Sequence, residues 1–379
     1  MTEIRAATFN LWGVPYSAEQ PARARVLGAA LAEGRYDIIT LQEVWRREDL
    51  PVILAGAEAA GLNYAHHFAS ASIGSGMVTL SRYPIVDAFF VRFRLQGRFD
   101  RLMHGYYFCG KGIGLARVET PDGILDVYNT HTIAQYVLTE PADRYKAHRA
   151  AQCYEVARCI AWGSAAGNPA LVMGDFNTRD DQFAYRVTTE LAGLRDAWRE
   201  MCPDDPGITF STANPYSETD EHARLDYVFL RDGSSHALAP VRAALAFDTA
   251  PANEVPAISD HYGVAVDFEM RSAKKRLSPS AWAKDTGPML VELAEALNDG
   301  VGELKVLRRR YAGRAEVSAL GVIPASIVAD RLPGPLRWLT PLLVLLYAFA
   351  HWFVVRFTLA DESAAMTAMR DEVRQQITE

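Results

Sequence analysis

The feature that most constrains the fold is an alternation of short strand patterns and helical patterns that runs from residue 3 to about residue 270. The strand patterns are rich in β-branched and aromatic residues and are bounded by Gly, Pro, Asn or Asp. Helical patterns at 18–34 and 139–163 separate some of them. This alternation predicts an α/β layered fold with mixed sheets. The expected strands are residues 4–12, 36–44, 75–85, 112–120, 124–132, 169–177, 224–231 and 262–270.

The bulk composition restricts the class of protein. A net charge of −7 argues against a nucleic-acid backbone as the main partner, because such proteins usually carry a basic face. The four cysteines show no metal-ligand spacing and no CxxC motif, which is typical of free thiols in a reducing compartment. The N-terminal residues enter a strand directly and show no secretory signal pattern. We therefore expect residues 1–270 to form a catalytic domain in the cytoplasm.

The composition changes after residue 270. Residues 271–287 are basic and contain Ser and Pro, which predicts a linker, and residues 288–379 have helical patterns. The first predicted helix has one apolar face, which would suit docking on a protein core or lying on a membrane surface. The residues on this face are Leu290, Leu293, Leu297, Val301, Leu304, Leu307 and Tyr311.

Residues 338–355 form an apolar run without Asp, Glu, Lys or Arg, at the lower length limit for crossing a bilayer. Arg337 and Arg356 flank the run, and aromatic residues stand at both ends, as in interfacial anchors. Residues 271–337 hold twelve Lys and Arg against seven Asp and Glu, which favours an anionic leaflet. We predict a membrane anchor whose number of crossings stays open. A buried helical hairpin or a dimer interface is the alternative.

Polar residues recur where the predicted strands end, and any single one could be a turn or cap residue. Their recurrence at the edges of core strands is more informative, because ligands of α/β sheets usually bind at strand ends. These residues are Asn10, Glu43, His131, Asp175, Asn177, Asp226, Asp260 and His261.

This set suits metal-assisted hydrolysis of a phosphate ester. Asn10, Glu43 and Asp260 offer the hard oxygen ligands that Mg²⁺ prefers. A histidine such as His261 has an ordinary pKa of about 6.5, which suits a general base at neutral pH. The sequence has no GxSxG elbow, no Cys–His constellation and no GxxxxGK[ST] loop, so neither a covalent intermediate nor a nucleoside triphosphate is indicated.

The motifs "TFNLWG", "LQEVW", "NTH", "MGDFN", "RLDYVFL" and "SDHYGV", in this order, resemble the endonuclease/exonuclease/phosphatase superfamily typified by DNase I. Within it, "NLWGVPY", "HHFASASIGSGMVTLSRYPI", "GKGIGLARV" and "AHRAAQ" resemble the neutral sphingomyelinases, which are Mg²⁺-dependent. The resemblance covers residues 3 to about 270. It implies a four-layer sandwich of two mixed β-sheets with helices outside, and the apolar C-terminal extension resembles the membrane-anchored members.

The resemblance implies a role for each residue of the metal side. Glu43 would be the principal Mg²⁺ ligand, with Asn10 and Asp260 completing the site. Mn²⁺ is a possible substitute, and one or two metal ions are compatible with this set. His261 would take a proton from the attacking water, and Asp226 would orient His261.

The remaining roles concern the phosphate. Asp175 and Asn177 would position the water and a phosphate oxygen, His131 would donate to the phosphate, and Lys111 would approach the site. Two positions depart from the pattern. Tyr106 stands where some relatives have Asp, which puts an Asp–Lys contact in doubt. Gln135 stands where relatives can have Glu, which weakens a second metal ligand there.

The implied function is hydrolysis of sphingomyelin to ceramide and phosphocholine at a membrane. The expected partners are a membrane phospholipid and the bilayer, with no nucleic acid and with the oligomeric state open. The alternatives are a phosphodiesterase acting on a lyso-lipid or a glycerophospholipid, a nuclease, and a non-catalytic scaffold. The C-terminal region would hold the protein at the membrane.

Overall fold

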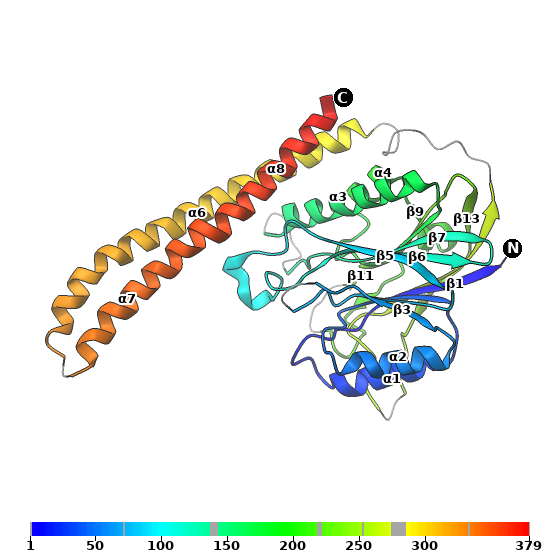
Figure 1. Ribbon diagram of the computed structural model, residues 1–379, viewed down its shortest axis with the longest axis horizontal. Coiled ribbons are helices and arrows are strands. Elements are labelled where there is room, and N and C mark those ends of the chain that lie inside the picture. Colours follow the sequence, from blue (N-terminus) through cyan, green and yellow to red (C-terminus); the bar gives the residue numbers. More distant parts are fainter. Residues whose placement is uncertain are drawn as a thin grey trace. The chain divides into compact units, whose positions relative to one another are not determined.

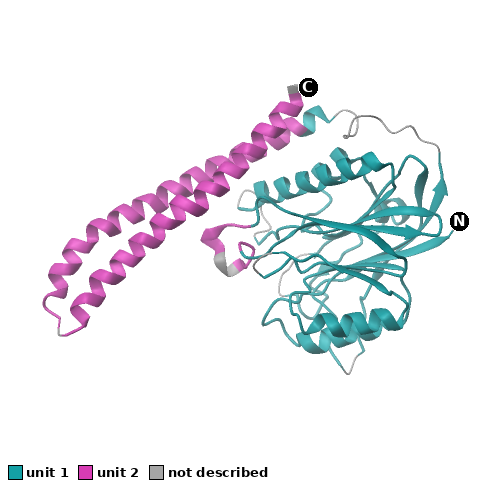
Figure 2. Cartoon of the chain, viewed as in Figure 1, with its two compact units in different colours: residues 1–96, 108–289 teal, residues 97–107, 290–379 magenta. Residues whose placement is uncertain are grey.

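The computed structural model describes residues 2–70, 73–136, 143–217, 222–251, 254–273, 286–332 and 334–378. The chain divides into two compact units (Figure 2). The first comprises residues 1–96 and 108–289 and contains the β-sheets. The second comprises residues 97–107 and 290–379 and contains the long C-terminal helices. Most of the expected linker, residues 274–285, lies outside the described residues.

The first sheet has six strands in the order β13-β14-β1-β2-β4-β3. β1 pairs parallel with β2 and antiparallel with β14, so the sheet is mixed. The parallel pair brings the C-terminal ends of β1 and β2 to the same sheet edge. The strands are β1 (Glu3–Asn10), β2 (Ile38–Gln42), β3 (Tyr64–His67), β4 (Val78–Ser81), β13 (His236–Ala246) and β14 (Gly263–Ser272).

The second sheet also has six strands, in the order β5-β6-β7-β8-β12-β9. β7 and β8 are parallel, and β12 is antiparallel to β8. The strands are β5 (Ile85–Arg92), β6 (Gly112–Thr120), β7 (Gly123–His131), β8 (Ala170–Asp175), β9 (Arg195–Asp196) and β12 (Asp226–Arg231). A short ribbon of β10 (Phe210–Ser211) and β11 (His222–Ala223) stands apart from both sheets.

The two sheets pack face to face through their apolar side chains. Ile4, Ala6 and Phe268 of the first sheet share one buried cluster with Val127 and Leu171 of the second. β1 and β14 alternate between this interior and the outer face, as the period of a strand requires. The interface between the sheets is therefore the central core of the first unit.

Helices cover the outer faces, which completes the expected four layers (Figure 1). α1 (Gln20–Ala32) and α2 (Asp49–Ala59) pack on the first sheet, where Leu27 and Ile53 join Phe9 and Leu41 in a second cluster. α3 (Lys146–Gly163) and α4 (Phe183–Ala192) lie over the second sheet, and a short α5 (Ala197–Met201) follows β9. The predicted α/β sandwich of two mixed sheets is confirmed.

The second unit is built around a long helical hairpin. α6 (Gly287–Ala329) is followed by α7 (Leu336–Phe353), which runs through a π-helical turn, η3 (Val354–Thr358), into α8 (Leu359–Thr378). Arg370 bonds Asn298, and the rings of His351 and Tyr311 lie 5.2 Å apart, so the two arms are antiparallel. Leu293 and Leu297 of the predicted apolar face are fully buried.

The hairpin changes character along its length. Near its open end, α6 and α8 bury their apolar residues, including Leu304 and Met366. Toward the connecting turn, large apolar side chains stay exposed, including Leu320, Trp338 and Leu346. Gly287–Ala329 and Leu336–Ile377 are both long and apolar enough to cross a membrane.

Candidate active site

The ends of two strands of the first sheet place the first group of candidate residues. Asn10 is the last residue of β1 and pairs with Gln42, so Glu43 follows at the same edge. β14 runs in the opposite direction and begins beside the end of β1, which brings in Asp260 and His261 just before it. Glu43 has a positive φ of 57°, a strained value for a residue with a side chain.

The second sheet supplies a row of three side chains. His131 pairs with Asp175 across β7 and β8, and Asp175 pairs with Asp226 across β8 and β12. All three are at least 99% buried. The register of three neighbouring strands therefore sets these residues side by side.

A hydrogen bond joins the two sheets at this edge. Asn10 donates from Nδ2 to Oδ2 of Asp175 over 2.9 Å, while its Oδ1 accepts from the N–H of Trp12. Residues far apart in the sequence thus meet in one centre within the first unit. Asn10 and Asp175 are therefore direct neighbours, while the bond from Trp12 also gives Asn10 a turn contact.

His261 and Asp226 form a close pair. The His261 Nδ1 lies 2.8 Å from Oδ2 of Asp226. Burial opposes the charge on the imidazole, but the charges of Asp226 and Asp260 prevail and raise the pKa of His261 well above its ordinary value. The ring also rests on Phe210, with centroids 5.1 Å apart. This arrangement fixes the orientation of the ring. Asp226 contacts Nδ1, and Nε2 is the nitrogen on the opposite side of the ring.

Asp175 and Asn177 are held together by local hydrogen bonds. The backbone N–H of Asn177 donates to Oδ1 of Asp175, and its side-chain amide donates to Oδ2 and to the carbonyl of Thr132. Asn177 has a φ of 46°, which Asn tolerates better than most residues. Burial and the nearby Asp226 charge raise the pKa of Asp175 to about 6.

Lys111 reaches this centre from the start of β6. Its Nζ lies 2.7 Å from Nε2 of His131 and donates to the carbonyl of Thr132 over 3.0 Å. His131 Nε2 lies 3.4 Å from Oδ2 of Asp175 and 3.7 Å from Oε1 of Glu43. The structure therefore brings Lys111 to the same centre as the other predicted residues.

The centre contains carboxylate oxygens that suit a cation. Oε2 of Glu43 and Oδ1 of Asp226 are buried and have no hydrogen-bond partner within the described part of the chain. Burial raises the pKa of Glu43, and burial together with the Glu43 charge raises the pKa of Asp260 to about 6. Closely spaced buried carboxylates with unsatisfied oxygens are a donor set that Mg²⁺ fits.

The tightest group of potential ligand atoms is not the one expected from the sequence. Atoms of Asp175, Asp226 and His261 lie within 4.8 Å of one another. Asp226 and His261 already contact each other. The group can therefore be described either as metal ligands or as a hydrogen-bonded pair beside the carboxylate of Asp175. The set of Glu43, Asn10 and Asp260 stays a prediction.

Arg23 on α1 is a residue that the sequence reasoning missed. It is fully buried, and its guanidinium donates to the carbonyls of Leu11, Trp12 and Ile258. Burial lowers the pKa of Arg23. These bonds tie the segment after Asn10 to the segment before Asp260, so Arg23 supports the edge of the first sheet. No motif pointed to it, since its partners are backbone groups.

Of the two positions that depart from the expected pattern, Gln135 has a clear partner. Its Oε1 accepts from Nε2 of Gln182 over 2.9 Å. Whether position 135 supplies a second metal ligand stays a prediction. Tyr106 is buried and belongs to the second unit.

The four-layer sandwich, with histidine, amide and carboxylate groups gathered where both sheets end, defines the DNase I-like class of proteins. The model of the endonuclease/exonuclease/phosphatase family matches residues 7–261, and the chain belongs to this family. A crystal structure of a beta toxin variant from Staphylococcus aureus with bound magnesium ions has the same fold. It gives a TM-score of 0.52 at 17% identity and covers 70% of this chain and 99% of that one.

The chain is also similar in sequence to proteins named as neutral sphingomyelinases and as phosphosphingolipid phospholipases C. A putative neutral sphingomyelinase of Drosophila melanogaster is 31% identical over 73% of this chain and 63% of its own length. An inositol phosphosphingolipids phospholipase C of Schizosaccharomyces pombe is 31% identical over 53% of this chain and 47% of its own length. The matched region thus spans less than two thirds of either relative.

Proposed function

We propose that this protein is a Mg²⁺-dependent phosphodiesterase of the phospholipase C type that acts on phosphosphingolipids, sphingomyelin among them. The products from sphingomyelin would be ceramide and phosphocholine. The observation that carries the proposal is the 2.8 Å contact between His261 and Asp226 at a centre that also holds the unsatisfied oxygen of Glu43. The relatives named as sphingomyelinases support this substrate class.

In its neutral form, with Nδ1–H donated to Asp226, His261 would act as the general base. It takes a proton from water while the water oxygen bonds to phosphorus, and the bond from phosphorus to the ceramide oxygen breaks. The ceramide oxygen then takes up a proton, so atoms and charge balance. Asp226 holds the ring by its Nδ1 and stabilises the imidazolium that forms. Positioned proton transfer of this kind typically contributes 10²–10⁴-fold in rate.

Glu43, Asn10 and Asp260 would hold the cation. When bound, Mg²⁺ neutralises phosphate charge and polarises the P–O bond. Asp175 and Asn177 would orient the attacking water and a phosphate oxygen. His131, with Lys111 behind it, would direct a hydrogen-bond donor at the phosphate.

The C-terminal hairpin supports membrane attachment. Its exposed apolar side chains cluster toward the connecting turn, and Arg308, Arg309, Arg310 and Arg356 stand along the helices that lead there. Arginines beside an apolar segment suit an anionic membrane surface. We propose that this region holds the protein at a bilayer, with the first unit in the cytoplasm.

A head-group release assay tests the function. The panel contains sphingomyelin, a lyso-lipid, phosphatidylcholine and plasmid DNA, each with Mg²⁺, with Mn²⁺ and with a chelator. We expect sphingomyelin hydrolysis that requires the metal and is abolished in His261→Ala and Glu43→Ala, with both variants still folded by circular dichroism. Near wild-type activity in either variant would refute this site.

Other substrates would use the same chemistry. Another phosphosphingolipid as substrate is supported by the relative named for inositol phosphosphingolipids. A glycerophospholipid, a lyso-lipid or a nucleic acid is less favoured, and the acidic net charge of −7 opposes the last. Faster cleavage of plasmid DNA than of lipid would establish a nuclease. If no substrate is cleaved in a metal-dependent way, the alternative of a non-catalytic scaffold remains.

A further inference from the structure

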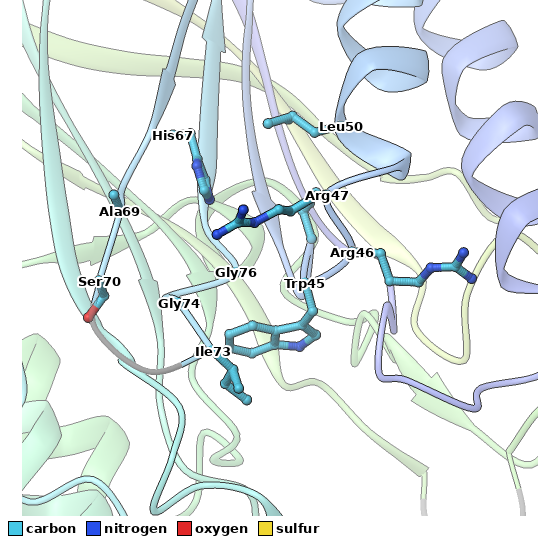
Figure 3. Close-up of a pocket in the computed structure, with 11 residues that line it drawn as sticks. Trp45, Arg46, Arg47, Leu50, His67, Ala69, Ser70, Ile73, Gly74 and Gly76 are labelled. Atoms are coloured by element: carbon cyan, nitrogen blue, oxygen red, sulfur yellow. The ribbon is translucent and has the colours of Figure 1, made fainter.

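A cavity of about 480 Å³ lies in the first unit (Figure 3). Its volume is in the range of small-molecule sites, about 300–1,000 Å³. The segment after β2, the end of β3 and residues 69–70, 73–74 and 76 before β4 supply its lining. The lining residues are Val44, Trp45, Arg46, Arg47, Leu50 and His67, together with Ala69, Ser70, Ile73, Gly74 and Gly76.

The segments that form the cavity are hydrogen-bonded to those that carry Glu43 and Lys111. Val44 donates its N–H to the carbonyl of Gly76 over 2.9 Å, and Val44 directly follows Glu43. Gly74 accepts from the N–H of Gly110 over 2.7 Å, and Gly110 directly precedes Lys111. These links bring the cavity near the centre, where one substituent of a bound phosphodiester would reach it.

The lining combines an apolar ring with hydrogen-bonding groups. The Trp45 ring packs on Gly76 so closely that a Cβ there would come within 2.9 Å of it. Figure 3 shows the guanidinium of Arg47 directed toward the ring of His67. Ser70 adds a hydroxyl. A flat ring beside several donors suits a compact group that carries hydroxyls.

Arg46 is differently placed, although it is the neighbour of Arg47. Its side chain extends away from Arg47 and His67 in Figure 3. It pairs with Glu48 and Asp49, at 3.8 and 4.0 Å, and donates to Gln20. Its charge is therefore offset by local carboxylates, and Arg47 is the arginine that faces the cavity.

The charge of the lining discriminates between head groups. None of the described residues that line the cavity is a carboxylate, while Arg47 carries a permanent positive charge. Arg47 is exposed, so solvent weakens its repulsion of a quaternary ammonium group, but no carboxylate among the described lining residues offsets that repulsion. The hydroxyls of a polyol can accept from the guanidinium and meet no such repulsion.

We propose that this cavity is the head-group subsite and that it prefers an uncharged polyol, such as a cyclitol, to choline. This inference rests on the proposed hydrolysis of phosphosphingolipids and ranks the substrates within that class. Arg47 supplies the specificity, and Trp45 supplies the apolar wall.

The kinetic test compares ceramide phosphoinositol with sphingomyelin in matched mixed micelles. We expect a higher kcat/KM for ceramide phosphoinositol, and a fall of about tenfold in the ratio of the two values in Arg47→Gln, the size of one lost hydrogen bond from a charged group. Arg35→Gln removes an equal charge from an exposed arginine outside the lining and keeps the wild-type ratio. Equal loss on both substrates, or the same change of ratio in Arg35→Gln, overturns the proposal.

A binding measurement keeps the test independent of activity. Calorimetry with inositol 1-phosphate and with phosphocholine, in Mg²⁺ and full-length protein, should give tighter binding of the former and about tenfold weaker binding of it in Arg47→Gln. If neither lipid is hydrolysed but this preference holds, the proposed function fails and the subsite stands. If both lipids are hydrolysed and phosphocholine binds as tightly as inositol 1-phosphate, the subsite fails and the function stands.

Discussion

Nζ of Lys111 lies 2.7 Å from Nε2 of His131, and both side chains are at least 99% buried. Burial lowers the pKa of Lys111 to about 8, so the amine is still mostly charged at neutral pH. Burial and then the Lys111 charge lower the pKa of His131 well below its ordinary value. An ammonium group can only donate, so a neutral His131 accepts at Nε2 and the two residues act as one unit.

A double-mutant cycle tests this unit. Lys111→Met should lower kcat/KM by about 10–100-fold, because it removes a charge-assisted hydrogen bond from a buried group. His131→Ala should cost a similar factor, and the double variant should lose far less than the product of the two. The measurement is phosphosphingolipid hydrolysis, with Lys305→Met as a control that removes a lysine from α6. Strictly multiplicative losses would contradict the coupling.

The unsatisfied oxygen of Glu43 leads to a prediction about stability. A cation that binds only the folded protein stabilises it by about 2.7 kcal/mol at a hundredfold excess over Kd. We expect the melting temperature of the wild type to rise with Mg²⁺ concentration, and the rise to be much smaller in Glu43→Gln. Scanning calorimetry measures this without any substrate.

The control for the metal prediction is Glu58→Gln, which changes an exposed glutamate on α2. It should respond to Mg²⁺ as the wild type does. An undiminished response in Glu43→Gln would place the cation elsewhere, with Asp175 and Asp226 as the next ligands to test.

Much of the sheet architecture could be predicted, since most core strands are apolar runs that end abruptly at polar residues. β13 was missed because its alanine-rich sequence contains Pro240, where the pairing with β14 shifts register. α2 was missed because its sequence is mostly apolar and shows no clear division into an apolar and a polar face. It also carries Pro51 in its first turn. The sequences of β13 and α2 are compatible with the structures that they adopt. Their type and bounds, however, depend on packing against neighbouring elements.

The candidate site shows the same division. Asp175 and Asp226 stand at strand ends that the pattern marks, and the pairing of β8 with β12 then brings them together. Arg23 gave no such signal, because it binds the carbonyl of Ile258, 235 positions away. Arg47 gave none either, since the cavity that it faces exists only once β3 and the loop before β4 are placed.

Asp37 predicts a pH dependence of stability away from the site. Burial alone would raise the pKa of Asp37, but hydrogen bonds from Arg5 and Arg82 outweigh this effect and lower that pKa. A carboxyl whose pKa is lower in the folded state stabilises the fold above its unfolded value of about 3.9, and this contribution is lost as pH falls below it. Asp37→Asn should therefore lose about 1–3 kcal/mol at pH 7.

The difference between wild type and Asp37→Asn should shrink as the pH is lowered from 5 toward 2. Denaturant unfolding at a series of pH values measures it. Asp87→Asn serves as the control, since Asp87 is 66% exposed and lies 4.0 Å from Arg117. A constant difference across this range would show that Asp37 does not act through its charge.

The exposed apolar residues of α7 predict how the protein meets a bilayer. Leu343 and Leu346 are 55% and 52% exposed, and a charged side chain in the middle of a membrane helix costs about 2.5–3.5 kcal/mol. The double variant Leu343→Glu with Leu346→Glu should lose flotation with anionic vesicles.

The control variant is Val306→Glu, which places one charge at an exposed position nearer the open end of the hairpin. It should float as the wild type does. Hydrolysis of a water-soluble phosphodiester should stay the same in all three proteins, because the side chains proposed to act in catalysis all belong to the first unit. Full flotation of the double variant would mean that these leucines face protein rather than lipid, as in the dimer interface that the apolar run also permits.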